Sequence, residues 1–200
     1  MALNWCCEPV DLHALGCDFY VASGHKWLLG PKETGLLYVR PEMRDTIAAT
    51  SIGAYSTQEF DWIDGSIQLL PTDQRYEYGT VNVPLRVGLG EAIEFIQKIG
   101  IENVWKRDRM LSTKLYEGLR ALPGVTVLSP EDPTMRSAMI TLKVEGLPHL
   151  KLQEHLNTYN LRTRSVTEGG LAALRISLHI YNFPSDVETV LEGVRTALKG

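Results

Sequence analysis

The chain has 200 residues and is 44% hydrophobic, enough to bury a core in one domain or two small ones, so disorder is not expected. Its 20 Lys and Arg against 24 Asp and Glu give a net charge of -4 without a long basic block, which argues against a nucleic-acid partner. No apolar stretch reaches the roughly 18 residues that span a bilayer, and no basic region followed by an apolar run opens the chain. We therefore expect a soluble, cytoplasmic protein with no membrane partner.

Three cysteines, Cys6, Cys7 and Cys17, lie near the amino end. An odd number crowded into one short stretch is not the framework of a disulfide-stapled secreted domain, so a reducing, cytoplasmic setting fits better. We expect these side chains to pack rather than react. No metal site is predicted.

The first elements in chain order are two short strands on either side of a turn. Residues 18–22 and 35–39 are rich in aromatic and aliphatic side chains, and Gly30-Pro31 marks a turn between them. Lys26 therefore lies where a strand passes into a loop. From residue 41 to about 82 the pattern has little periodicity, which predicts mostly loop with short elements.

Two helices are predicted next. The first runs from Pro84 to about Gly100, because its apolar residues keep helical spacing. The second runs from about Glu102 to Leu122, and Pro123-Gly124 ends it. Together they suggest a helical connection between two lobes.

The remainder predicts a compact α+β lobe. The expected order is two strands, a helix, two strands and a helix, at residues 125–128, 138–144, 148–159, 161–165, 174–178 and 185–198. Ser185 is the expected N-cap of the last helix, with Glu188 as its capping-box partner.

The chemistry lies first in the tetrapeptide Ser23-Gly24-His25-Lys26. A lysine that attacks a carbonyl must be held against its target and be at least partly neutral. Ser23 and His25 could donate to a phosphate, and Gly24 lets the backbone come close. Taken alone, such a tetrapeptide is more often a solvated loop lysine beside a structural histidine.

The longer context favours the functional interpretation. Residues 17–26, followed by Gly30-Pro31 and residues 35–39, resemble the lysine region of the class V aminotransferase family of fold-type I enzymes that use pyridoxal 5'-phosphate (PLP). This family includes cysteine desulfurases, C–S lyases and isopenicillin N epimerase-like proteins. The resemblance implies that Lys26 binds PLP as a Schiff base and shuttles a proton, while Ser23 and His25 help to hold the phosphate.

Two further segments carry the resemblance. Residues 75–82 are similar to a family segment in which Gly79 and Thr80 would reach the phosphate of the neighbouring subunit, which implies a homodimer. Residues 174–182 resemble the strand whose arginine, here Arg175, grips the substrate carboxylate through paired hydrogen bonds. Taken alone, the first segment is more often a Gly-Thr turn, and such an arginine more often only covers a sheet edge or pairs with a nearby Glu. On strand alternation Arg175, Ser177 and His179 share one face, although His179 is expected to be structural.

The chain also departs from the family pattern. Residues 164–171 lack the loop cysteine of the desulfurases, so persulfide chemistry there is not expected. Glu33 stands where the family usually has glycine and would be strained by about 1 kcal/mol if that site needs positive φ. The match covers only the family's second half, without its phosphate-binding turn and the aspartate that pairs with the pyridine nitrogen.

The resemblance implies an α/β fold in which the end of a PLP-transferase large domain is followed by a small C-terminal α+β domain. Residues 1–93 would form the partial cofactor-binding domain and residues 94–200 the small domain with the linking helices. The expected function is that of a PLP-dependent enzyme acting on an amino acid, of aminotransferase, C–S lyase or epimerase type. The alternative is a truncated, catalytically inactive PLP-fold fragment, or a partner or dimerisation module.

Overall fold

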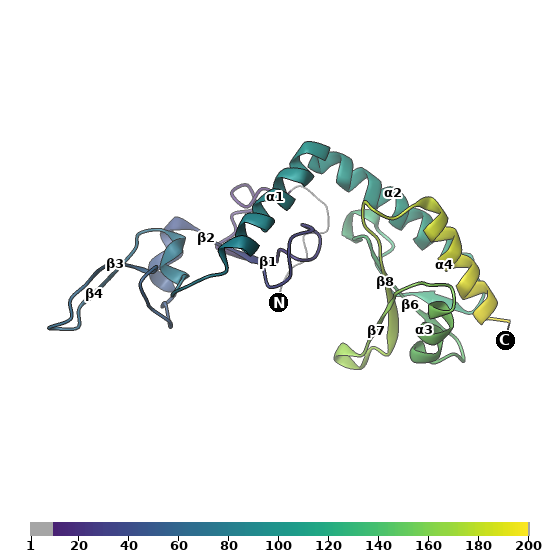
Figure 1. The fold of residues 1–200 in the computed structure, drawn as a ribbon. Coiled ribbons are helices and arrows are strands. Elements are labelled where there is room, and N and C mark those ends of the chain that lie inside the picture. Colours follow the sequence, from purple (N-terminus) through teal and green to yellow (C-terminus); the bar gives the residue numbers. More distant parts are fainter. Residues whose placement is uncertain (1–9, 200) are drawn as a thin grey trace. The chain divides into compact units, whose positions relative to one another are not determined.

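The computed structural model describes residues 10–199, which form two compact units (Figure 1). The first unit comprises residues 10–99 and the second residues 100–199 of the described chain. Each unit has its own buried side chains. In the part of the chain that the structure covers, no helix is both long and apolar enough to cross a membrane.

The first unit is built on an antiparallel pair of strands, β1 (Phe19–Ser23) and β2 (Gly35–Val39). Both were predicted, and β1 begins and ends one residue later than expected. Ser23 is thus the last residue of β1 and pairs with Gly35. The buried apolar side chains of this unit are Ala22, Leu28, Val39, Leu89 and Ile96.

Residues 41–82 contain only short elements, as predicted. They are the 3-10 helices η1 (Pro41–Thr46) and η2 (Asp73–Tyr76) and the hairpin of β3 (Thr57–Phe60) and β4 (Ile67–Leu69). The two 3-10 helices are joined by ion pairs, Arg44 to Asp73 at 2.6 Å and Arg75 to Asp45 at 2.9 Å. Apolar side chains at the hairpin tip are exposed, Trp62 by 89% and Ile63 by 97%.

Helix α1 (Val83–Ile99) closes the first unit, and α2 (Ile101–Arg120) opens the second. Leu89 and Ile96, seven residues apart and hence on one helix face, are the buried residues of α1. Gly100 separates the helices with φ of 88°, a left-handed conformation that glycine adopts without steric cost. The predicted stop at Gly100 is confirmed.

The second unit contains a four-stranded antiparallel sheet in the order β5-β6-β8-β7. Its strands are β5 (Val125–Val127), β6 (Met139–Val144), β7 (Arg164–Val166) and β8 (Ala173–Ser177). The predicted strand at 161–165 was misplaced, because β7 begins only at Arg164. The short 3-10 helices η3 (Pro133–Met135) and η4 (Glu168–Gly170) lie in the connections.

Three helices, α2, α3 (His149–Asn157) and α4 (Pro184–Ala197), lie on one side of this sheet (Figure 1). Fully buried leucine, isoleucine and valine side chains fill the layer between them, among them Leu111, Leu115, Ile140, Leu142, Leu156, Leu174 and Val187. Alternation along β6 and β8 places Ile140, Leu142 and Leu174 on the side of the sheet that faces the helices, and leaves the opposite face open.

The predicted capping of α4 was wrong in its residues. Phe183, not Ser185, is the N-cap, because Pro184 already occupies the first helical turn, a position that suits proline. The acid that reaches back is Asp186, not Glu188, and its carboxylate accepts a hydrogen bond from the backbone N–H of Phe183 at 2.9 Å.

Candidate active site

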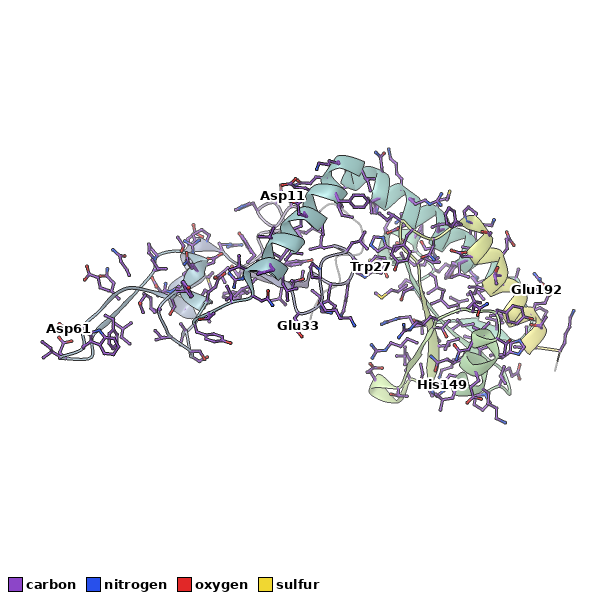
Figure 2. The ribbon with its side chains drawn as sticks, in the orientation of Figure 1. Asp11, Trp27, Glu33, Asp61, His149 and Glu192 are labelled. Atoms are coloured by element: carbon purple, nitrogen blue, oxygen red, sulfur yellow. The ribbon has the colours of Figure 1, made fainter. Side chains whose placement is uncertain are left out.

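The tetrapeptide that carries Lys26 forms the start of the turn between β1 and β2. The backbone N–H of Gly24 donates to the carbonyl of Thr34 at 2.9 Å, and that of Gly30 donates to the carbonyl of Gly24 at 2.9 Å. Both ends of the turn are therefore held to one point at the end of β1. Figure 2 labels Trp27 and Glu33 within this turn.

Gly24 is required at this point by close packing. A Cβ atom there would overlap Oγ1 of Thr34 and lie 2.8 Å from Cδ1 of Leu89 on α1. Gly30 is equally close, since its Cβ would lie 2.7 Å from the same Leu89 atom. The two glycines let the turn pack directly on α1, which fixes the backbone on either side of Lys26.

The polar side chains of the Lys26 tetrapeptide lie toward the surface. His25 and Lys26 are exposed and Ser23 is half-buried, whereas Leu28 is 5% exposed and anchors the turn in the core. The carbonyl of Lys26 accepts a hydrogen bond from the backbone N–H of Leu29 at 3.1 Å. The result is an accessible primary amine on a fixed backbone, beside two further polar groups able to donate hydrogen bonds.

The turn contains two non-glycine residues with positive φ, Leu29 at 58° and Glu33 at 68°. Glu33, at the site where the family usually has glycine, thus has the left-handed conformation. Left-handed backbone costs L-residues free energy, so this turn holds some strain.

Gly79 and Thr80 lie in the first unit, in the segment between η2 and α1. The backbone just before them is held closely, because a Cβ at Gly53 would overlap the carbonyl oxygen of Tyr78. Around Gly79 itself there is space, with nothing within 4 Å of the position that a Cβ would take. Thr80 is exposed. The segment can therefore approach a ligand through its backbone.

Arg175 belongs to the second unit and lies in the middle of β8. Its strand neighbours are Thr141 on β6 and Arg164 on β7. Leu174 and Ile176 on either side are buried, so the half-buried Arg175 lies on the open face of the sheet. There its guanidinium can bind an anion.

His179 does not share that face. Strand β8 ends at Ser177, and the His179 ring is buried, with Nδ1 3.8 Å from Oδ2 of Asp108 on α2. The same nitrogen accepts a hydrogen bond from the backbone N–H of Ile180 at 2.6 Å. The alternation argument failed because the strand ends too early, and His179 packs as a structural residue.

Cys17 is half-buried, and its thiol lies 3.1 Å from the carbonyl oxygen of Phe19. Cys6 and Cys7 lie outside the described residues. Between residues 10 and 199, no group of three or more His, Cys, Asp or Glu side chains could hold a metal ion.

Sequence reasoning missed Arg164 and Glu168 as candidate site residues. They lie in the segment that had been considered only for its lack of cysteine. Arg164 faces Arg175 directly across the strand pair and makes a short ion pair with Glu168. The sequence did show Arg164 inside a predicted strand. Which residue lies opposite Arg164 depends on the register between β7 and β8, and the sequence alone does not give that register.

Comparison with known proteins places this geometry in a family. The model of the class-V aminotransferase family matches residues 1–190. A probable cysteine desulfurase of Mycobacterium leprae is 30% identical over 200 residues, which are 96% of this chain and 47% of that protein. A cysteine desulfurase of Klebsiella pneumoniae is 28% identical over 96% of this chain and 48% of its own length.

Solved structures agree. The apo cysteine desulfurase of Thermococcus onnurineus has 29% identity and a TM-score of 0.86, over 94% of this chain and 49% of that one. The cysteine desulfurase CsdA of Escherichia coli has 27% identity and a TM-score of 0.84, over 97% of this chain and 49% of that one. The cystine C-S lyase C-DES shares the fold, with a TM-score of 0.83 and 23% identity over 96% of this chain and 49% of that one. This chain spans about half the length of each.

The mixed α/β fold predicted from the resemblance is confirmed as about half of the PLP-transferase fold of these structures. One structure of C-DES holds glycine covalently linked to its PLP cofactor, and PLP is the cofactor of the family. The lysine turn after β1, the Gly79-Thr80 segment and Arg175 all lie within the matched residues. The chain therefore belongs to the class-V aminotransferase family of PLP-dependent enzymes.

Proposed function

We propose that this chain forms part of a PLP-dependent enzyme that acts on an amino acid, with Lys26 as the residue that bonds the cofactor. The observation that carries the proposal is the closed turn after β1, which holds an exposed Lys26 amine on a backbone packed against α1. The reaction would be transamination, C–S lysis or epimerisation.

The donors around Lys26 fit the cofactor. Ser23 and His25 offer a hydroxyl and a ring nitrogen to a phosphate, and both are at least partly accessible. Thr80 adds a second hydroxyl, and the open space at Gly79 admits a group against its backbone. We propose that Gly79 and Thr80 serve the phosphate of a neighbouring subunit, so that the working form is a homodimer.

When bound, PLP would supply an electron sink for the bond broken at the substrate's α-carbon. Nζ of Lys26, the residue that would hold the cofactor, would take up and return a proton at that carbon. His25, next along the chain, would add a donor near the phosphate. The tight packing of Gly24 and Gly30 would keep the backbone of Lys26 in a fixed position during proton transfer.

Arg175 would fix the substrate. Its place on the open face of the sheet gives a carboxylate access to a planar guanidinium, which can donate two parallel charge-assisted hydrogen bonds. Because the strand is paired on both sides, the backbone of Arg175 is fixed in direction. An amino acid held in this way has its α-carbon in a defined orientation.

The relatives named above are mostly cysteine desulfurases, yet this chain differs from that branch at the loop before β8. Residues 164–171 contain no cysteine, and the cysteine that the structure describes, Cys17, lies before the lysine turn. A thiol on the loop is what a persulfide-forming enzyme of this branch needs. We therefore favour a lyase, epimerase or aminotransferase reaction over desulfuration.

The test is to add PLP to the purified chain and record the visible absorption of the lysine-bound cofactor. We expect a band that Lys26→Ala abolishes, and borohydride reduction that fixes the cofactor mass on the peptide containing Lys26. Lys32→Ala is the matched control, because Lys32 is an exposed lysine of the same turn and should leave the band unchanged. A band that survives Lys26→Ala would contradict the assignment.

A further inference from the structure

Two arginines lie side by side on the open face of the second unit's sheet. Arg164 of β7 is the direct antiparallel partner of Arg175 of β8. Side chains at directly opposite positions share one face, with Cβ atoms about 4.5–5.5 Å apart. Two guanidinium groups therefore project from neighbouring points, on the side away from the helices.

Like charges at directly opposite positions destabilise a strand pair, so an anion between Arg164 and Arg175 would reduce the repulsion of their guanidinium groups. Within the chain, the carboxylate of Glu168 supplies one through its short ion pair with Arg164. The other oxygen of Glu168 accepts a hydrogen bond from the backbone N–H of Thr167 at 3.0 Å. Hydrogen bonding to its own backbone N–H, and then the charge of Arg164, hold the pKa of Glu168 below its ordinary value.

This ion pair can be exchanged. The side chains of Arg164 and Glu168 are 57% and 62% exposed, and ion pairs at that exposure contribute little stability. Glu168 begins the short helix η4, where Gly169 and Gly170 both have positive φ, at 62° and 72°. The carboxylate is thus carried by a tight turn rather than by a strand, and a ligand carboxylate can take its place on Arg164.

We infer that Arg164 is a second carboxylate-binding residue beside Arg175, and that the carboxylate of Glu168 pairs with Arg164 when no ligand is bound. The substrate is then an amino acid whose side chain carries a second anionic group. The inference rests on the proposed function in one respect, the assignment of Arg175 to the α-carboxylate. The second anion would then lie on Arg164. Arg164 acts here as a specificity-determining residue.

The probe is glutarate, a dicarboxylate, compared with butyrate, which has the same number of methyl or methylene carbons but one carboxylate. Both are titrated into the full chain without PLP, and the Nε–Hε signals of Arg164 and Arg175 are followed by NMR. We expect glutarate to bind about tenfold more tightly than butyrate, since it makes one more charge-assisted contact. Arg164→Gln should reduce that ratio to about one, and Glu168→Gln should raise the affinity for glutarate several-fold.

Arg195→Gln is the matched control, because Arg195 is an arginine of α4 in a comparable short ion pair with Glu192. It should leave the ratio unchanged. Arg164→Lys keeps the charge and should recover part of the preference, which a loss of folding would not. Equal binding of glutarate and butyrate, or a preference that survives Arg164→Gln, would overturn the inference. Failure of the PLP band alone would reject the enzyme while leaving the dicarboxylate preference intact.

Discussion

Replacing Glu33 by glycine should stabilise the first unit. Glu33 lies in the turn between β1 and β2 with φ of 68°, a left-handed conformation, and its side chain is exposed. Left-handed backbone costs an L-residue about 1–2 kcal/mol. Glycine does not incur that cost, but it loses about 0.4–1 kcal/mol more entropy on folding. The net expectation is stabilisation by about 0.5–1 kcal/mol.

The neighbouring exposed residue Lys32 offers a control of opposite sign. Lys32 is not among the positive-φ residues of the turn, so Lys32→Gly gains nothing from relief of strain. It should destabilise the unit by about 0.4–1 kcal/mol through unfolded-state entropy alone. The two substitutions introduce the same residue at adjacent positions, which makes the difference between them the informative quantity.

Native-state hydrogen exchange of the β1 and β2 amides measures the effect where it arises. Opening free energies should rise in Glu33→Gly and fall in Lys32→Gly. If Glu33→Gly lowers the opening free energy as Lys32→Gly does, the left-handed conformation at Glu33 is not a source of strain, and the reasoning fails.

Three further predictions concern the site and its surroundings. Gly24→Ala should destabilise the first unit by about 1–3 kcal/mol, because the added methyl group overlaps Thr34, and urea unfolding measures this. Arg175→Lys should leave PLP binding intact but weaken amino-acid binding by about 1.5–3 kcal/mol, as titration of the PLP-loaded chain would show. Asp132 accepts hydrogen bonds that hold its pKa below the ordinary value, so its contribution to stability is present above pH about 4 and is lost as pH falls through the lowered pKa. Asp132→Asn should flatten the stability profile in that range.

Each of these has a matched comparison. Gly90→Ala adds a methyl group on α1 where nothing lies within 4 Å, and should stabilise rather than destabilise. Equal losses of PLP and amino-acid binding in Arg175→Lys would instead indicate a structural role. The donors to Asp132 are the side-chain hydroxyl and the backbone N–H of Thr134, so Thr134→Val should remove part of the same acid sensitivity. An unchanged profile in both variants would refute that assignment.

The sequence predicted the helices closely because their signal is local. Apolar residues at helical spacing gave α1 and α2, and a glycine that ends the first helix is visible as such. The lysine turn could be recognised equally well, since Ser23, Gly24, His25 and Lys26 are contiguous. At Glu33 the sequence left two possibilities open, a positive φ or an adjusted turn, and the structure has the positive φ.

What the sequence did not predict depends on partners distant along the chain. Strand β7 is a three-residue edge strand, and its bounds are set by pairing with β8 rather than by its own residues. The pairing of Arg164 with Arg175 follows from that register and could not be read from composition. His179 was misassigned to a face because alternation holds only as long as the strand continues, and β8 stops at Ser177.

The division into two units, each with its own buried layer, determines how unfolding of this chain should be measured. Cooperative two-state unfolding is a property of single domains, so two melting steps are expected here rather than one. Trp27 and Trp62 lie in the first unit and Trp105 in the second, while Trp5 lies outside the described residues. With Trp5 replaced by phenylalanine throughout, replacing either group by phenylalanine as well would make fluorescence a reporter of one unit. Each substitution would then be scored against the melting step of the unit that contains it.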